Sequence, residues 1–118
     1  MPTWDDVARI ALALPETSER LSRGLRQWVV RDKLFVWERP LRAAGPILGA
    51  RVEHLGAKEA VLAGDPEVFF TTPHFDGYPA VLARLDRIAP EDLDEVIVEA
   101  LGRAVEPRLD DAYLAGRG

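Results

Sequence analysis

The chain has 118 residues, of which 47% are hydrophobic and 30% are charged, and these proportions are typical of one compact, soluble domain spanning residues 1–118. It contains no cysteine, which excludes disulfides and thiolate chemistry and fits a reducing cytoplasm. The N-terminus lacks the basic and apolar regions of a signal peptide, and no apolar stretch approaches the roughly 20 residues that a membrane span requires. We therefore expect a cytoplasmic protein without a membrane partner.

Charge is distributed unevenly along the chain. The formal net charge is −5, which works against nonspecific nucleic-acid binding by the molecule as a whole. Residues 20–42, however, hold seven bases against two acids, a local charge of +5, whereas residues 89–111 hold eight acids against two bases, a local charge of −6. The simplest interpretation of the acids is a solvated helix face. The basic segment is therefore the stronger indication of a binding surface.

The first half of the chain predicts one helix and three strands. Thr3 is placed to cap a helix over residues 3–14, which ends before Pro15. Residues 15–25 are polar and without a clear period, which indicates a loop. Residues 26–31 and 34–39 are rich in aromatic and β-branched side chains and flank Asp32, which is typical of a tight hairpin. Residues 47–54 alternate in polarity, as a third, half-exposed strand does.

The second half predicts two helices and two further strands. Residues 57–63 form a short helix that Gly64 is placed to end, and residues 68–71 and 84–88 are predicted strands. The last helix begins at Pro90 and keeps a continuous apolar stripe up to Pro107, after which residues 108–118 form a tail. The order is α-β-β-β-α-β-β-α. Its hairpin and meander connections predict a two-layer α+β fold, with an antiparallel five-stranded sheet and helices on one face.

Several stretches of the chain resemble a known family. They are Trp4–Val7, which opens a helix that ends in Leu12–Glu16, then Lys33–Phe35, Leu62–Pro66 and, most specifically, Thr72–Leu85. These stretches are similar to the MmcQ/YjbR family of small bacterial proteins, and the similarity spans nearly the whole chain. The resemblance implies a two-layer fold similar to type III secretion chaperones. It also implies a DNA-binding role, proposed from a double-wing structural analogy, and no established enzymatic activity.

The predicted hairpin interleaves aromatic rings with cations. Trp28 and Trp37 alternate with four bases, and such a surface offers cations to phosphate and flat faces to stacked groups. Because side chains alternate between the faces of a strand, we expect at least one of the two Trp rings to lie in the core. Arg51 adds a base on the next strand. Gly45, Gly49 and Gly56 are too scattered for a phosphate-binding loop.

The loop around His74 is the second candidate. Asp76 follows two residues later and Tyr78 four later, so a carboxylate could set the imidazole tautomer as a general base requires. No nucleophile or second base lies nearby in the sequence. The simpler interpretation is that His74 bonds loop backbone while the surrounding rings and prolines lock the turn. A metal site from His54, His74 and Asp76 lacks the usual ligand spacing, so neither a metal nor a cofactor is expected.

We therefore hypothesise a non-enzymatic binding module that binds DNA through the basic hairpin, Arg51 and the loop at 74–78. Two alternatives stay open. One is a protein-interaction adaptor that works as a chaperone-like dimer, and the other is a small-ligand pocket or enzyme centred on His74, Asp76 and Tyr78. Both a monomer and a homodimer fit the sequence. The candidate site residues are Arg26, Trp28, Arg31, Lys33, Arg51, His74, Tyr78 and Arg84.

Overall fold

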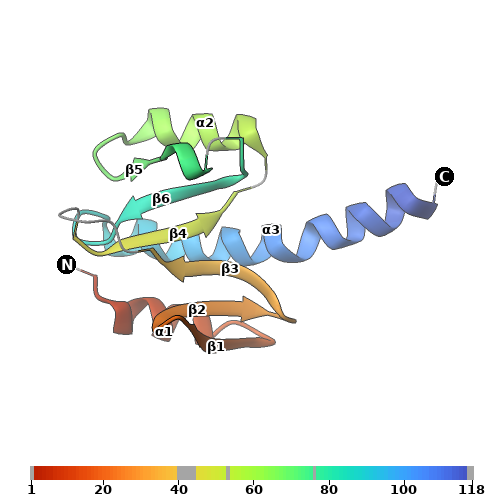
Figure 1. Cartoon of the computed structure of the whole chain (residues 1–118), viewed down its shortest axis with the longest axis horizontal. Helices are drawn as coiled ribbons and strands as arrows, with labels where there is room; N and C mark the ends of the chain where they lie inside the picture. The colour runs from red at the N-terminus through yellow and green to blue at the C-terminus, as the bar shows by residue number, and fades with distance from the viewer. Residues whose placement is uncertain (1, 40–44, 53, 76, 117–118) are drawn as a thin grey trace.

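A six-stranded antiparallel sheet forms the centre of the molecule (Figure 1). The computed structural model describes residues 2–39, 45–52, 54–75 and 77–116, without the side chains of residues 74 and 106–116. The sheet order is β1-β2-β3-β4-β6-β5. The elements are α1 (Trp4–Leu12), β1 (Thr17–Ser22), β2 (Leu25–Val30), β3 (Lys33–Glu38), β4 (Ile47–Arg51), α2 (Leu55–Gly64), β5 (Phe69–Phe70), the short 3₁₀ helix η1 (Pro73–Phe75), β6 (Ala80–Arg84) and α3 (Pro90–Gly116). This confirms the predicted α+β class and two-layer architecture.

Two rows of side chains, paired strand to strand, define the two faces of the sheet. One row runs through Glu19, Trp28, Val36, Ala50 and Val81, and we call its side the covered face, because α1 and α3 pack against it. The adjacent row runs through Arg20, Gln27, Trp37, Gly49 and Leu82, and we call its side the open face. Neighbouring residues of a strand point to opposite sides, so the two rows diverge along the whole sheet.

The main core lies between the covered face and the two helices. It includes Trp28 and Leu48 from the sheet, Val7 from α1 and Ile97 from α3, all fully or almost fully buried. Phe35 joins them although its neighbour Val36 faces the same side. A register shift between β2 and β3 leaves Phe35 without a partner, and such a bulge re-aims the extra side chain.

Helix α1 begins where the sequence predicts. The Thr3 hydroxyl accepts a hydrogen bond from the Asp6 N–H, and the Asp6 carboxylate accepts one from the Thr3 N–H at 2.8 Å, which completes a capping box. This bond from the Thr3 backbone lowers the pKa of Asp6. The cap fixes the entry of the chain into α1, so that Val7, Ile10 and Ala11 face the core.

The predicted sheet was wrong in strand number and in one strand position. Residues 17–22, expected in a loop, form the edge strand β1, which pairs on one side only and leaves most of its side chains in water. A polar edge strand has no apolar period, so periodicity could not reveal it. The last strand is β6, at Ala80–Arg84, rather than 84–88. After Arg84 the chain turns, and the Arg84 carbonyl accepts hydrogen bonds from the N–H groups of Arg87 and Ile88.

The final helix was predicted correctly at its start and not at its end. Helix α3 begins at Pro90 and continues to Gly116, beyond the expected end at Pro107. Residues after Pro107 include several good helix formers, which favour continuation of the helix although Pro107 itself lacks an N–H and interrupts one helical hydrogen bond. The continuation carries α3 past the edge of the sheet (Figure 1).

Two tight turns join the first three strands, and both require left-handed backbone. Arg23 and Gly24 have φ values of 54° and 79°, and Arg31 and Asp32 have φ values of 50° and 67°. Positive φ at both central residues is the geometry of a type I′ turn, which matches the twist of paired strands. Glycine adopts this geometry freely, whereas a side chain with a Cβ is strained in it.

Replacing Asp32 with glycine should therefore stabilise the fold. We expect Asp32→Gly to raise the free energy of unfolding by about 1 kcal/mol, because the second turn position loses its Cβ strain. Urea denaturation measures the change. Asp32→Ala is the matched control, since it removes the carboxylate and keeps the Cβ, and an equal gain in both variants would contradict the backbone explanation.

Candidate functional site

The candidate site is a groove on the open face. It has a volume of about 500 Å³ and lies between the β2–β3 hairpin and the loop that contains η1. We call it the open-face groove, and its lining residues are Ser22, Arg23, Leu25, Gln27, Leu34, Trp37, Glu38, Arg39, Phe75 and Tyr78. It exists because α1 and α3 cover only the other face, while the η1 loop covers only part of this one.

Trp37 contributes the aromatic floor of the groove. Its side chain is 8% exposed and packs with Ile47, Phe75 and Leu82 in a small second core. The indole lies directly over Gly49 of the neighbouring strand, where any Cβ would overlap the ring. A glycine at this position is therefore what allows a Trp ring to lie flat across the sheet. The sequence carries no periodic signal for this contact, because residues 37 and 49 come from different strands.

The η1 loop supplies one wall of the groove. Phe75 stacks on Trp37 with ring centroids 6.1 Å apart, and Tyr78 meets Phe75 edge-on at 6.3 Å. Tyr78 is 46% exposed, so its ring is available at the rim. The ammonium group of Lys58, from α2, is buried and donates hydrogen bonds to the carbonyl oxygens of Phe75 at 2.5 Å and Tyr78 at 3.0 Å. These bonds fasten the η1 loop to α2.

Arg39 lies at the point where the floor and the wall meet. Its guanidinium carbon is 5.2 Å from the Phe75 ring centroid, within range of a cation–π interaction. Its Nε is buried and has no hydrogen-bond partner among the described residues, and no other described side chain has such an atom. Buried polar atoms are nearly always bonded, so this nitrogen is an exception in the described part of the chain.

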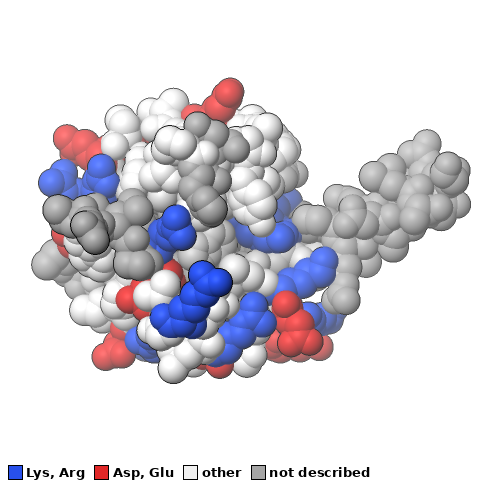
Figure 2. All heavy atoms as spheres, viewed as in Figure 1, with Lys and Arg blue, Asp and Glu red and all other residues white. Residues whose placement is uncertain are grey.

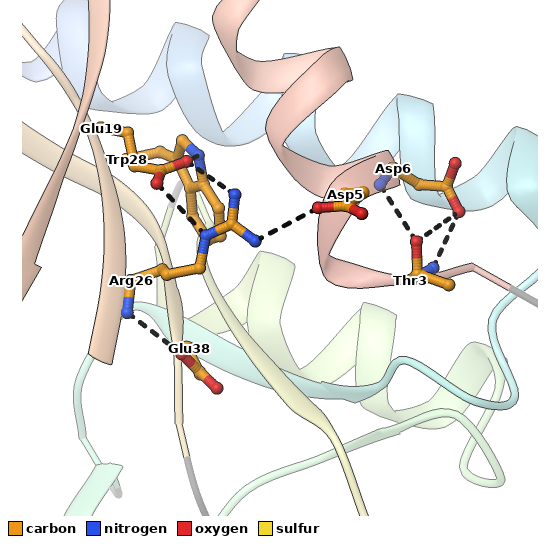
Figure 3. Close-up of polar contacts among 7 residues, drawn as sticks. All are labelled: Thr3, Asp5, Asp6, Glu19, Arg26, Trp28 and Glu38. Atoms are coloured by element: carbon orange, nitrogen blue, oxygen red, sulfur yellow. Dashed lines mark hydrogen bonds and ion pairs between the residues drawn. The ribbon is translucent and has the colours of Figure 1, made fainter. Parts of the chain in front are cut away.

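The predicted site residues Arg26 and Trp28 lie on the covered face, away from the groove (Figure 3). Trp28 is fully buried, stacks on Trp4 at 6.2 Å and donates its indole N–H to Glu19 at 2.9 Å. Arg26 pairs with Glu19 at 2.9 Å and with Asp5 at 3.7 Å. The hydrogen bond to Glu19 raises the pKa of Arg26. These residues fasten α1 to the sheet, and the expectation that at least one Trp is core is confirmed.

Arg31 and Lys33 lie at the tip of the β2–β3 hairpin. Arg31 is bound to Glu16, to which its Nε donates a hydrogen bond of 2.6 Å. Lys33 is half-buried at the first position of β3. Neither residue lines the open-face groove.

The remaining predicted residues are spread along the other half of the sheet. The Arg84 guanidinium stacks over the Phe70 ring at 4.3 Å, and Arg51, at the end of β4, lines a separate cavity of about 190 Å³ that Glu99 also lines. Among the predicted site residues whose side chains the structure describes, Tyr78 alone lines the groove. The side chain of His74 and the whole of Asp76 lie outside the described residues. Among the side chains that the structure describes, no cluster of three His, Asp or Glu could hold a metal.

Ion pairing separates the cations of the two faces. Within the described residues, Arg9, Arg26 and Arg31 have carboxylate partners, whereas Arg20, Arg23 and Arg39 have none. Arg20 instead donates to Gln27 at 3.0 Å on the open face. The single carboxylate of the described groove lining, Glu38, accepts the Arg26 N–H at 3.1 Å. Figure 2 shows several Lys and Arg side chains on the side of the sheet that faces away from α3, with Asp and Glu side chains among them.

The sequence did not single out Arg20, Arg23 and Arg39 as site residues. Arg20 and Arg23 fell in a segment expected to be a loop, so their face could not be assigned. Their contribution to the local charge of +5 was the available signal. Arg39 was visible as one base of the hairpin, and its position follows from alternation with Trp37.

Comparison with known proteins finds a solved structure with the same fold and relatives with similar sequences. The crystal structure of Deinococcus radiodurans protein DR2400, a DUF419 domain protein, has the same fold, with a TM-score of 0.70 and 18% sequence identity over 85% of this chain and 76% of that one. No family model matches the chain. It is 46% identical, over the full length of both proteins, to the uncharacterized proteins Rv2570 of Mycobacterium tuberculosis and Mb2600 of Mycobacterium bovis. The chain belongs to the same family as these mycobacterial proteins.

In the part of the chain that the structure describes, no helix combines the length and the apolar character needed to cross a bilayer.

Gly49 provides a direct test of the groove floor. Gly49→Ala should displace the Trp37 indole and lower the free energy of unfolding by about 1–3 kcal/mol, because the added methyl overlaps the ring. Near-UV circular dichroism and urea denaturation measure the two effects. Gly102→Ala in α3 is the control, since its added methyl meets no atom within 4 Å and should stabilise the helix slightly. Unchanged stability and near-UV signal in Gly49→Ala would show that the indole does not lie there.

Proposed function

We propose that this chain is a non-enzymatic binding module that binds DNA through the open face of its sheet. The observation that carries the proposal is a difference in pairing between arginines: Arg9 and Arg26, on α1 and the covered face, have carboxylate partners, and Arg20, Arg23 and Arg39 of the open face have none among the described residues. A cation without a carboxylate partner is available to a phosphate, and phosphate contacts supply much of the affinity of proteins for DNA.

The charge of the whole molecule is compatible with this proposal. The acids of the last helix, such as Glu91 and Asp94, are exposed on α3, which lies against the covered face. Helix α3 lies on the side of the sheet opposite the open face (Figure 1). The acids of α3 are thus kept apart from the unpaired arginines, and this distribution orients the open face toward a polyanion.

The resemblance to the MmcQ/YjbR family supports the same function. We propose membership of that family and a cytoplasmic location, and its DNA-binding label agrees with the charge argument. The most specific stretch of the resemblance, Thr72–Leu85, forms the loop wall of the groove and strand β6. The protein-adaptor and small-ligand hypotheses make different predictions, since neither requires unpaired arginines on one face.

Matched charge reversals test the proposal. Arg20→Glu and Arg9→Glu change the net charge equally, but Arg20 lies on the open face and Arg9 is on α1. We expect Arg20→Glu to weaken binding of a labelled duplex about tenfold at low salt, because a phosphate contact becomes a repulsion. Arg9→Glu should change the affinity less than twofold.

Fluorescence anisotropy over a series of salt concentrations measures both affinities and the number of phosphate contacts. Equal losses in the two variants would mean that net charge alone governs the interaction. Absence of wild-type binding even at low salt would remove the proposed function.

A further inference from the structure

We infer that the open-face groove binds one unpaired nucleotide of single-stranded DNA, with its phosphate on Arg39 and its base against Tyr78. This inference rests on the proposed function and adds to it, because the surface cations alone do not distinguish single strands from duplexes. It is carried by the contents of the groove, which combine an arginine that lacks an acceptor with an exposed aromatic ring.

Arg39 has the features of an anion anchor. Its guanidinium is held against the Phe75 ring, and its backbone N–H donates to the Ile47 carbonyl at 2.9 Å, so both ends of the residue are fixed. The planar fork of a guanidinium binds a phosphate through two N–H groups together. The Nε of Arg39 is buried, so its terminal nitrogens are the groups offered to a phosphate in the groove. Arg39 also has no carboxylate partner among the described residues, so no ion pair must break first.

Tyr78 supplies a surface for a base. The ring is 46% exposed at the rim, and Phe75, beside it, is in contact with the Arg39 guanidinium. Phe75 thus contacts both the phosphate anchor, Arg39, and the stacking ring, Tyr78. The two groups lie close together, as the phosphate and the base of one nucleotide do. Stacking of a base on an aromatic side chain contributes about 1–3 kcal/mol, and it needs a base whose face is free. The bases of a duplex have no free face away from its ends.

The groove is prepared for this ligand before binding. Lys58 holds the carbonyls of Phe75 and Tyr78, and the Trp37 ring is held flat over Gly49. A wall and floor fixed by such contacts lose little conformational entropy when a ligand enters. The volume of about 500 Å³ is in the range of pockets that hold one small ligand, which is the size of a single nucleotide unit.

The test compares an oligothymidylate with a duplex of the same length, using fluorescence anisotropy. We expect the wild-type protein to bind the single strand at least about tenfold more tightly, because stacking on Tyr78 is added to the phosphate contacts. Tyr78→Ala should remove most of this preference and change duplex affinity less than twofold, whereas Arg39→Gln should weaken binding of the single strand more than binding of the duplex. Tyr78→Phe keeps the ring and should keep the preference, and Arg9→Gln is the control for loss of a cation elsewhere.

A second probe tests the inference on the wild-type protein alone, so the result does not depend on whether a variant folds correctly. An abasic strand keeps the phosphates and lacks the bases, and it should bind about as weakly as the duplex. If the oligothymidylate, the abasic strand and the duplex bind alike while Arg20→Glu still weakens all three, the nucleotide site is wrong and the proposed function stands. If no DNA binds at low salt, both are wrong.

Discussion

The alternation of side chains along the β2–β3 hairpin is the constraint on which the rest of this structure depends. Trp28 is paired across the sheet with Val36, and Trp37 is paired with Gly49, in adjacent rows that face opposite sides. One Trp therefore completes the core under α1, and the other becomes the floor of a groove. The arginines follow the same rule. Arg26 shares the side of Trp28, whereas Arg39 shares the side of Trp37.

This sorting determines what each arginine can do. On the covered face Arg26 meets Glu19 and Asp5, so its charge is used in holding α1 to the sheet. On the open face Arg39 contacts a phenylalanine ring and has no ion pair with a described carboxylate, so its charge is not used to hold two elements together. Arginines of one basic stretch of the sequence thus hold elements together on the covered face, whereas on the open face they have no carboxylate partner among the described residues.

Local patterns predicted the elements that local interactions form. The Thr3 cap, the hairpin and the apolar stripe from Pro90 are read directly from neighbouring residues, and the structure confirms all three. Strand β1 escaped prediction because its side chains are mostly in water and its pairing with β2 leaves no apolar period in the sequence. The long-range contacts were equally hidden. Arg31 meets Glu16 across fifteen residues, and Lys58 meets the carbonyl of Tyr78 across twenty, and no sequence period records such distances.

The three tryptophans offer the most direct test of the account, because each indole N–H gives its own signal in a nitrogen–proton correlation spectrum. During a titration with single-stranded DNA, the Trp37 signal should shift, since its ring is the groove floor, while the Trp4 and Trp28 signals on the covered face should stay in place. Assignment by Trp→Phe substitution identifies each signal. Shifts at Trp4 and Trp28 with none at Trp37 would contradict the account, because they would place the ligand on the face that the helices cover.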